Sequence, residues 1–120
     1  MLRQVILAAS RSHALRHVVE RAPISKQVVH RFVPGASVDE AVGATTELVT
    51  SGRTVTIDYL GEDTLDNTQA EATVTAYLTL LGRLADAGLT RGARAEVSVK
   101  LSAVGQALDE ALAFENASRI

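Results

Sequence analysis

The feature that most constrains the fold is a strand–helix–strand pattern in the second half of the chain. Residues 54–60 are rich in β-branched side chains and are bounded by Gly52 and Gly61, which is typical of a β-strand. A helix is then predicted over residues 68–87, because apolar residues recur there at helical spacing: Val74, Tyr77, Leu78, Leu81 and Leu84. Residues 95–101 form a second candidate strand. This order predicts two parallel strands joined by a right-handed helical crossover.

Two parallel strands do not complete a sheet. Each leaves an edge unpaired, and parallel strands need cover on both faces. A last helix is predicted from about Leu108 to the end of the chain, and no flexible linker or low-complexity segment interrupts these elements. Residues 53–120 therefore indicate an α/β fold of which this chain supplies only the first part.

The first part of the chain, residues 1–52, is helical in pattern. Three short stretches carry apolar residues at helical spacing, and a capping box of Ser37 and Glu40 opens a fourth helix that Gly52 ends. Basic side chains are frequent before this capping box. We interpret them as solvated helix faces, and the functional alternative is a weak attraction to an anionic surface.

Composition excludes several classes of protein. The formal net charge of -2 gives no electrostatic reason to expect a nucleic-acid partner. The absence of cysteine excludes disulfides, thiolate metal sites and a cysteine nucleophile, and it agrees with a reducing compartment. No apolar run reaches the length of a membrane span, and the start of the chain lacks the apolar core of an export signal. These features predict a cytoplasmic protein.

Lys100 is the sharpest candidate for a functional residue. Because side chains alternate along a strand, Ser98 and Lys100 face away from the helices if Val97 and Val99 face toward them. Ligands of α/β proteins bind at the carboxyl ends of parallel strands, where Lys100 is placed. A lysine at this position needs an anion, such as a substrate carboxylate or a flavin phosphate. The alternative is a lysine that extends from the strand end into water.

Two carboxylates follow the first strand. Glu62 lies in a loop just past the strand end, where loops form gates and clamps, and its alternative is a solvated loop carboxylate. Asp58 could act in catalysis or could accept hydrogen bonds from backbone amides of the turn at Leu60 and Gly61. We favour the structural role for Asp58.

The sequence contains no metal-spaced cluster and no common phosphate-binding glycine loop. His13 and His17 have the helical spacing that can bind a metal, but no carboxylate is suitably near in sequence. They are interpreted, with His30, as surface residues. We therefore predict no metal site.

Two strand-end segments carry a family resemblance. Residues 58–62, Asp-Tyr-Leu-Gly-Glu, follow the first strand, and residues 97–105 read Val-Ser-Val-Lys-Leu-Ser-Ala-Val-Gly. Together they resemble the proline dehydrogenase family. Residues 108–109 and 114–116 fit the helix that follows in that family, and the N-terminal helices resemble the lead-in of its short monofunctional bacterial members. The resemblance covers essentially the whole chain.

The resemblance implies a fold, a reaction and a site. The fold is a flavin-bearing (β/α)8 TIM barrel. The reaction is FAD-dependent oxidation of L-proline to 1-pyrroline-5-carboxylate, with hydride transfer to the flavin and electrons passed to a quinone, which implies peripheral contact with the inner face of the membrane. Lys100 would lie in the active site, bind the proline carboxylate and help to order the flavin. Glu62 would belong to a gate over the substrate.

A (β/α)8 barrel needs eight strands and roughly 250 residues, whereas this sequence has two strand candidates. We therefore expect N-terminal helices over residues 1–52 followed by the first two βα units of a truncated barrel over residues 53–120. Most FAD contacts would lie beyond residue 120, and the fragment would be inactive alone. The alternative is a non-catalytic fragment or interaction module that folds by self-association through exposed strand edges or by complementation.

Overall fold

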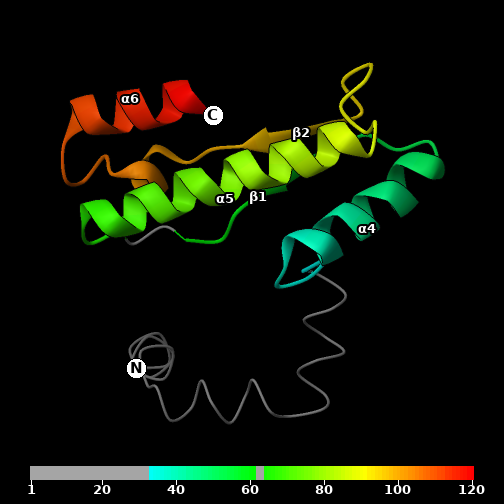
Figure 1. The fold of residues 1–120 in the computed structure, drawn as a ribbon, viewed down its shortest axis with the longest axis horizontal. Coiled ribbons are helices and arrows are strands. Elements are labelled where there is room, and N and C mark those ends of the chain that lie inside the picture. Colours follow the sequence, from blue (N-terminus) through cyan, green and yellow to red (C-terminus); the bar gives the residue numbers. More distant parts are fainter. Residues whose placement is uncertain (1–32, 62–63) are drawn as a thin grey trace, which may run out of the picture. The chain divides into compact units, whose positions relative to one another are not determined.

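The computed structural model describes residues 33–61 and 64–120. Ser37–Ile120 forms one compact unit, whose helices and strands are drawn in Figure 1. The predicted helices before residue 33, with their basic and histidine side chains, lie outside the described residues.

The unit begins with helix α4 (Val38–Thr50). The Ser37 hydroxyl accepts a hydrogen bond from the Glu40 N–H at 3.3 Å, and the Ser37 N–H donates to Glu40 Oε2 at 3.1 Å. Two of the N–H groups at the helix start are thereby satisfied. Gly52 follows the helix with φ +87, a conformation that glycine adopts without steric cost. The predicted cap and stop of this helix are confirmed.

The two strands pair in parallel, as predicted. Strand β1 (Val55–Asp58) lies beside β2 (Ala95–Ser98), with Val55 opposite Ala95 and Asp58 opposite Ser98. Both strands are shorter than the predicted ranges of residues 54–60 and 95–101. Pairing ends where the two backbones separate after Asp58 and Ser98, a tertiary feature that β-propensity does not encode.

The prediction that Lys100 lies in the second strand is wrong. Lys100 immediately precedes a short 3-10 helix, η1 (Leu101–Val104). The Ala103 N–H donates to the Lys100 carbonyl at 3.0 Å, and Gly105 with φ +105 ends the turn. The chain therefore leaves the strand direction at Lys100 because a glycine-terminated turn follows it.

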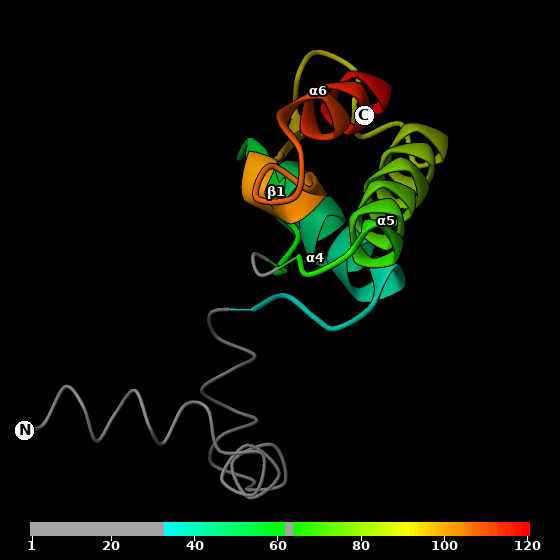
Figure 2. The same cartoon turned by 90° about the vertical axis from the view of Figure 1, so that its left-hand side faces the viewer.

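Helix α5 (Asn67–Asp86) connects the strands and packs on one face of the pair. Its N-terminus is capped by Asp66 Oδ1, which accepts the Gln69 N–H at 2.9 Å. Figure 2, which looks along the unit from one end, shows α5 beside α6 (Glu110–Arg119). Helical spacing predicts that Leu78 lies on the buried face of α5. Leu78 is instead 41% exposed, and Leu80 is buried.

The core consists of two aliphatic clusters. The first joins α4, α5 and the helix-facing side of the strands, and its buried members are Val49, Leu80, Leu84, Leu89 and Ala95. The second joins α5, η1 and α6, and its buried members are Val74, Val104 and Ala113. With few aromatic side chains in the sequence, aliphatic packing supplies most of the apolar burial that stabilises the unit.

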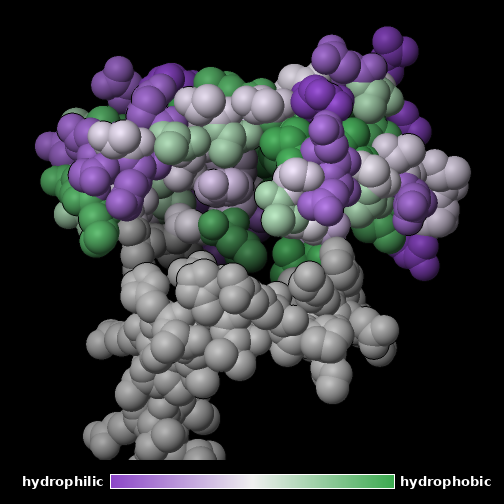
Figure 3. All heavy atoms as spheres, turned by 60° about the horizontal axis from the view of Figure 1, so that its bottom comes forward, coloured by the Kyte–Doolittle hydropathy of each residue, from purple (hydrophilic) through white to green (hydrophobic). Residues whose placement is uncertain are grey.

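The face of the strands that points away from α5 is polar. The Thr56 hydroxyl donates to Glu96 Oε1 at 3.0 Å across the pair, and both side chains are exposed. Apolar side chains also reach the surface of the unit among the charged ones (Figure 3).

The described residues contain one strand–helix–strand unit, the repeating element of α/β folds. The wider (β/α)8 barrel stays a prediction.

None of the helices within residues 33–61 and 64–120 is long and apolar enough to cross a membrane.

Candidate functional site

The carboxyl ends of β1 and β2 bring together the charged residues that the sequence singled out. Lys100 Nζ lies 2.9 Å from Asp58 Oδ2. The Lys100 side chain is 40% exposed and the Asp58 side chain 34% exposed, so an ion pair sits at the surface of the strand ends. Although Lys100 has left the strand, it lies at the edge where ligands of parallel α/β sheets bind.

Among the described residues, Asp58 supplies an anion beside Lys100. Within the same part of the chain, Asp58 contacts Lys100 and the Tyr77 hydroxyl. The predicted hydrogen bonds to Asp58 from the amides of the turn at Leu60 and Gly61 are absent there. A partly exposed ion pair contributes only about 0–1 kcal/mol. An incoming carboxylate can thus compete with Asp58 for the Lys100 ammonium.

Tyr77 is a member of this site that the sequence reasoning missed. Its side chain is fully buried. Its hydroxyl donates to the Ser98 carbonyl at 2.7 Å and accepts the Tyr59 N–H at 3.1 Å, and it lies 3.4 Å from Asp58 Oδ1. Helical spacing identified Tyr77 only as a core residue. The available signal was its chemistry, because a buried tyrosine hydroxyl needs a hydrogen-bond partner.

The environment of Tyr77 keeps its hydroxyl protonated. Burial raises the pKa of the Tyr77 phenol above its ordinary value, and the negative charge of Asp58 adds to the rise. The hydrogen bond from the Tyr59 backbone and the charge of Lys100 act in the opposite direction. The Tyr59 ring packs edge-on against Tyr77, with the ring centroids 6.0 Å apart.

The second predicted site residue, Glu62, lies outside the described residues. Its gate role therefore stays a prediction.

The strand ends expose the Lys100 ammonium beside the Asp58 carboxylate, and an ammonium is the group of this pair that can bind a carboxylate-bearing molecule. Lys100 fits a substrate carboxylate or a flavin phosphate, because either anion could share its ammonium. Among the described residues, no group of three or more histidine, aspartate or glutamate side chains could hold a metal ion. That Lys100 binds an anionic ligand stays a prediction.

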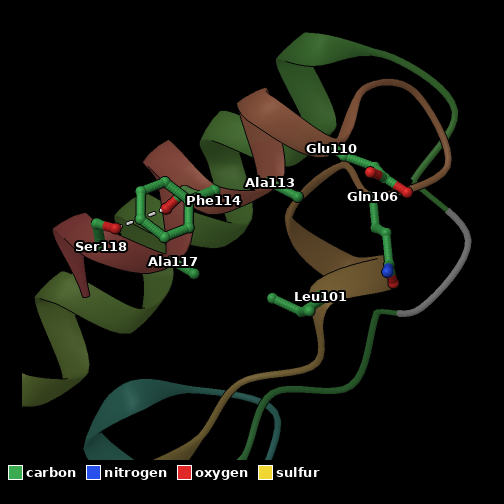
Figure 4. A pocket seen from close by; sticks show the side chains of 7 residues that line it. All are labelled: Leu101, Gln106, Glu110, Ala113, Phe114, Ala117 and Ser118. Atoms are coloured by element: carbon green, nitrogen blue, oxygen red, sulfur yellow. Dashed lines mark hydrogen bonds between the residues drawn. The ribbon is translucent and has the colours of Figure 1, made fainter.

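An open groove lies between η1 and α6 (Figure 4). Its lining residues are Leu101, Gln106, Glu110, Ala113, Phe114, Ala117 and Ser118. Phe114 is 75% exposed, and the Ser118 hydroxyl is turned back onto the Phe114 carbonyl at 2.7 Å. The Ser118 hydroxyl is therefore engaged by the backbone of its own helix.

Two curated proteins resemble this chain over most of its length. Proline dehydrogenase 1 of Bacillus subtilis strain 168 is 32% identical over 114 residues, which is 95% of this chain and 36% of the relative. Proline dehydrogenase 1 of Bacillus subtilis subsp. natto matches with the same identity and coverage. No family model matches the chain. The chain spans about a third of the length of these relatives, and the similarity supports a distant relationship to proline dehydrogenase.

Proposed function

We propose that this chain forms the N-terminal helices and first two βα units of a flavin-dependent proline dehydrogenase with a (β/α)8 barrel. The observation that carries the proposal is the Lys100–Asp58 pair at the carboxyl ends of two parallel strands. In such barrels the active site is built at this edge. The 32% identity to a proline dehydrogenase over 95% of the chain supports the same conclusion.

In this proposal Lys100 binds the carboxylate of L-proline. Asp58 holds the ammonium in place when substrate is absent and yields part of that contact when the carboxylate enters. Anchoring the carboxylate orients the ring carbon beside the proline nitrogen, which contributes by positioning. Bound FAD would supply the hydride-accepting chemistry, with a quinone as the final electron acceptor, and Lys100 would help to order the flavin. Glu62 closes the site as part of a gate.

A direct test transplants the chain into its relative. The matching segment of Bacillus subtilis proline dehydrogenase 1 is replaced by this chain, and FAD content and proline-dependent reduction of an artificial electron acceptor are measured. We expect a flavin-containing chimera that oxidises proline. A chimera that holds FAD but leaves proline unoxidised, while the parent enzyme is active, contradicts the proposal.

Lys100→Ala in the same chimera tests the assigned residue. Loss of a charge-assisted hydrogen bond should raise the KM for proline by about tenfold or more, with FAD content retained. Arg53→Ala is the matched control, because Arg53 is a cation just before the amino end of β1 and far along the strand from Asp58. Unchanged kinetics of Lys100→Ala would remove Lys100 from the site.

A second candidate function is a non-catalytic fragment that acts by association. The two-stranded sheet favours it, because in the described part of the chain each strand pairs on one side only. An absorbance scan of the purified chain, with intact mass on the same sample, tests whether such an assembly holds a flavin. We expect a colourless protein, since most flavin contacts belong to the rest of the barrel, and sedimentation across a concentration series then tests self-association.

A further inference from the structure

The backbones of β1 and β2 are joined by direct hydrogen bonds near their amino ends, and by a side chain at their carboxyl ends. The Val55 N–H donates directly to the Arg94 carbonyl at 2.9 Å. In a parallel ladder such bonds recur every two residues. The register of Val55 with Ala95 therefore sets the Tyr59 N–H opposite the Ser98 carbonyl.

A side chain occupies this last position of the ladder. The Tyr59 N–H donates to the Tyr77 hydroxyl at 3.1 Å, and that hydroxyl donates to the Ser98 carbonyl at 2.7 Å. One buried phenol thus stands between the two backbones and satisfies a group on each.

We propose that the Tyr77 hydroxyl is a spacer that ends the β1–β2 ladder and positions Lys100 against Asp58. Tyr77 is a positioning residue, because it acts on the ammonium through the backbone of both strands. The part of this inference that concerns substrate rests on the proposed function, whereas the positioning of the ion pair does not.

The connectivity explains why one hydroxyl can have this effect. Asp58 directly precedes Tyr59, and Lys100 follows Ser98 by two residues. Both groups held by the hydroxyl are therefore close along the backbone to the two charged side chains. Tyr77 is fully buried on a regular helix, so its hydroxyl is held firmly. The charged side chains are partly exposed, so holding them in one geometry costs side-chain entropy, and a fixed backbone on both sides favours their 2.9 Å contact.

The competing interpretation is a core tyrosine whose hydroxyl is merely satisfied. It expects that removing the hydroxyl lowers stability without changing the ion pair. The spacer role predicts that removing the hydroxyl also changes the reactivity of the Lys100 amine.

The sequence offers a direct measurement, because its two lysines are Lys26 and Lys100. Trace acetylation of the 120-residue chain with acetic anhydride, followed by peptide mass spectrometry, gives the ratio of labelling at Lys100 to labelling at Lys26. An ammonium that is engaged by the Asp58 carboxylate is less available to the reagent than a solvated one. Tyr77→Phe should raise the ratio about two- to fivefold, the range expected for loss of a partly exposed ion pair, and Asp58→Asn should do the same.

Two controls separate positioning from a loss of stability. Tyr59→Phe removes the hydroxyl of the neighbouring ring and should leave the ratio unchanged. Val74→Ala removes buried packing three residues earlier on α5 while retaining the Tyr77 hydroxyl. It should destabilise the chain without raising the ratio. An unchanged ratio in folded Tyr77→Phe, or an equal rise in Val74→Ala, overturns the inference.

A spectroscopic readout covers the case in which Tyr77→Phe does not fold. In the unmodified chain the Tyr59 amide should be protected from hydrogen exchange although it lies outside β1, because the hydroxyl accepts its proton. Exchange of that amide at the rate of an unfolded chain would contradict the spacer role of the hydroxyl.

None of these measurements uses proline or flavin. A chimera that holds FAD without oxidising proline therefore removes the proposed function alone, and an unchanged labelling ratio removes this inference alone.

Discussion

The two faces of the β1–β2 pair have opposite chemistry. The face toward the helices contributes to the first core cluster through Val55, Ile57, Ala95 and Val97. The opposite face carries Thr56, Asp58, Glu96 and Ser98, which are exposed. The covered face stabilises the unit, whereas the open face and the strand ends hold the groups able to bind a ligand.

The contrast follows from the period of two along a strand. Burying an aliphatic side chain contributes about 1.5–3 kcal/mol, whereas an exposed polar contact or ion pair contributes about 0–1 kcal/mol. Changes on the covered face should therefore affect folding, and changes on the open face should affect chemistry. Tyr77 should affect both folding and chemistry, since its ring is buried on the covered side and its hydroxyl reaches the strand ends.

The largest effect is expected for Leu84→Ala, in the cluster under the covered face. Leu84 is fully buried, so the change should lower the free energy of unfolding by about 2–5 kcal/mol through lost burial and a cavity. Urea denaturation measures it. Leu78→Ala is the control on the same helix, and because Leu78 is 41% exposed it should cost less than about 1 kcal/mol. Equal losses would contradict the assignment of the helix faces.

The next effect is expected for Tyr77→Phe. Removing the hydroxyl leaves the Tyr59 N–H and the Ser98 carbonyl without their shared partner, at a cost of about 1–3 kcal/mol. Thermal and urea unfolding should both report the loss. Tyr59→Phe, on an exposed ring, should stay within about 0.5 kcal/mol of the parent. If the two variants behaved alike, the buried hydroxyl would have no special role.

A smaller effect is expected at alkaline pH. The pKa of Tyr77 is raised in the folded state, chiefly by burial, so above about pH 10 the unfolded chain loses the phenolic proton first. The unfolded state then binds fewer protons, and the free energy of unfolding falls as pH rises from the unfolded toward the folded pKa. The parent should therefore lose more stability than Tyr77→Phe between pH 9 and pH 11, approximately. Parallel curves for the two proteins would contradict this linkage.

The smallest effect is expected on the open face. Glu96→Gln removes a charge but keeps an oxygen for the Thr56 hydroxyl, so stability should change by less than about 0.5 kcal/mol. Val97→Ala is the adjacent change on the covered face and should cost more. A larger loss for Glu96→Gln in urea denaturation would show that the open face also supports the fold.

Local sequence signals predicted the elements well and their ends less well. The capping box of Ser37 and Glu40 and the parallel strand pair are present as expected. The strands end earlier than β-propensity indicated, and Lys100 lies at the start of a turn, because strand length depends on where the partner backbone separates. Leu78 is exposed because the helical stripe that packs was set by the neighbouring elements.

The candidate site was predicted in part. Lys100 and Asp58 were both singled out by their place at strand ends, but their contact with each other was not foreseen. Tyr77 was assigned only to the core. Periodicity assigns a residue to a face, and it cannot say which polar atoms on different elements come within hydrogen-bond distance.

The sequence by itself determined the order of elements, the parallel sense of the strands and the separation of apolar from polar side chains, because these depend on local propensity and spacing. Only the tertiary structure decided which carboxylate meets Lys100 and which phenol stands between the strand ends. Those contacts join residues far apart in the chain. They depend on the strand register and on the rotation of α5 above it, and both are set by the packing of the whole unit.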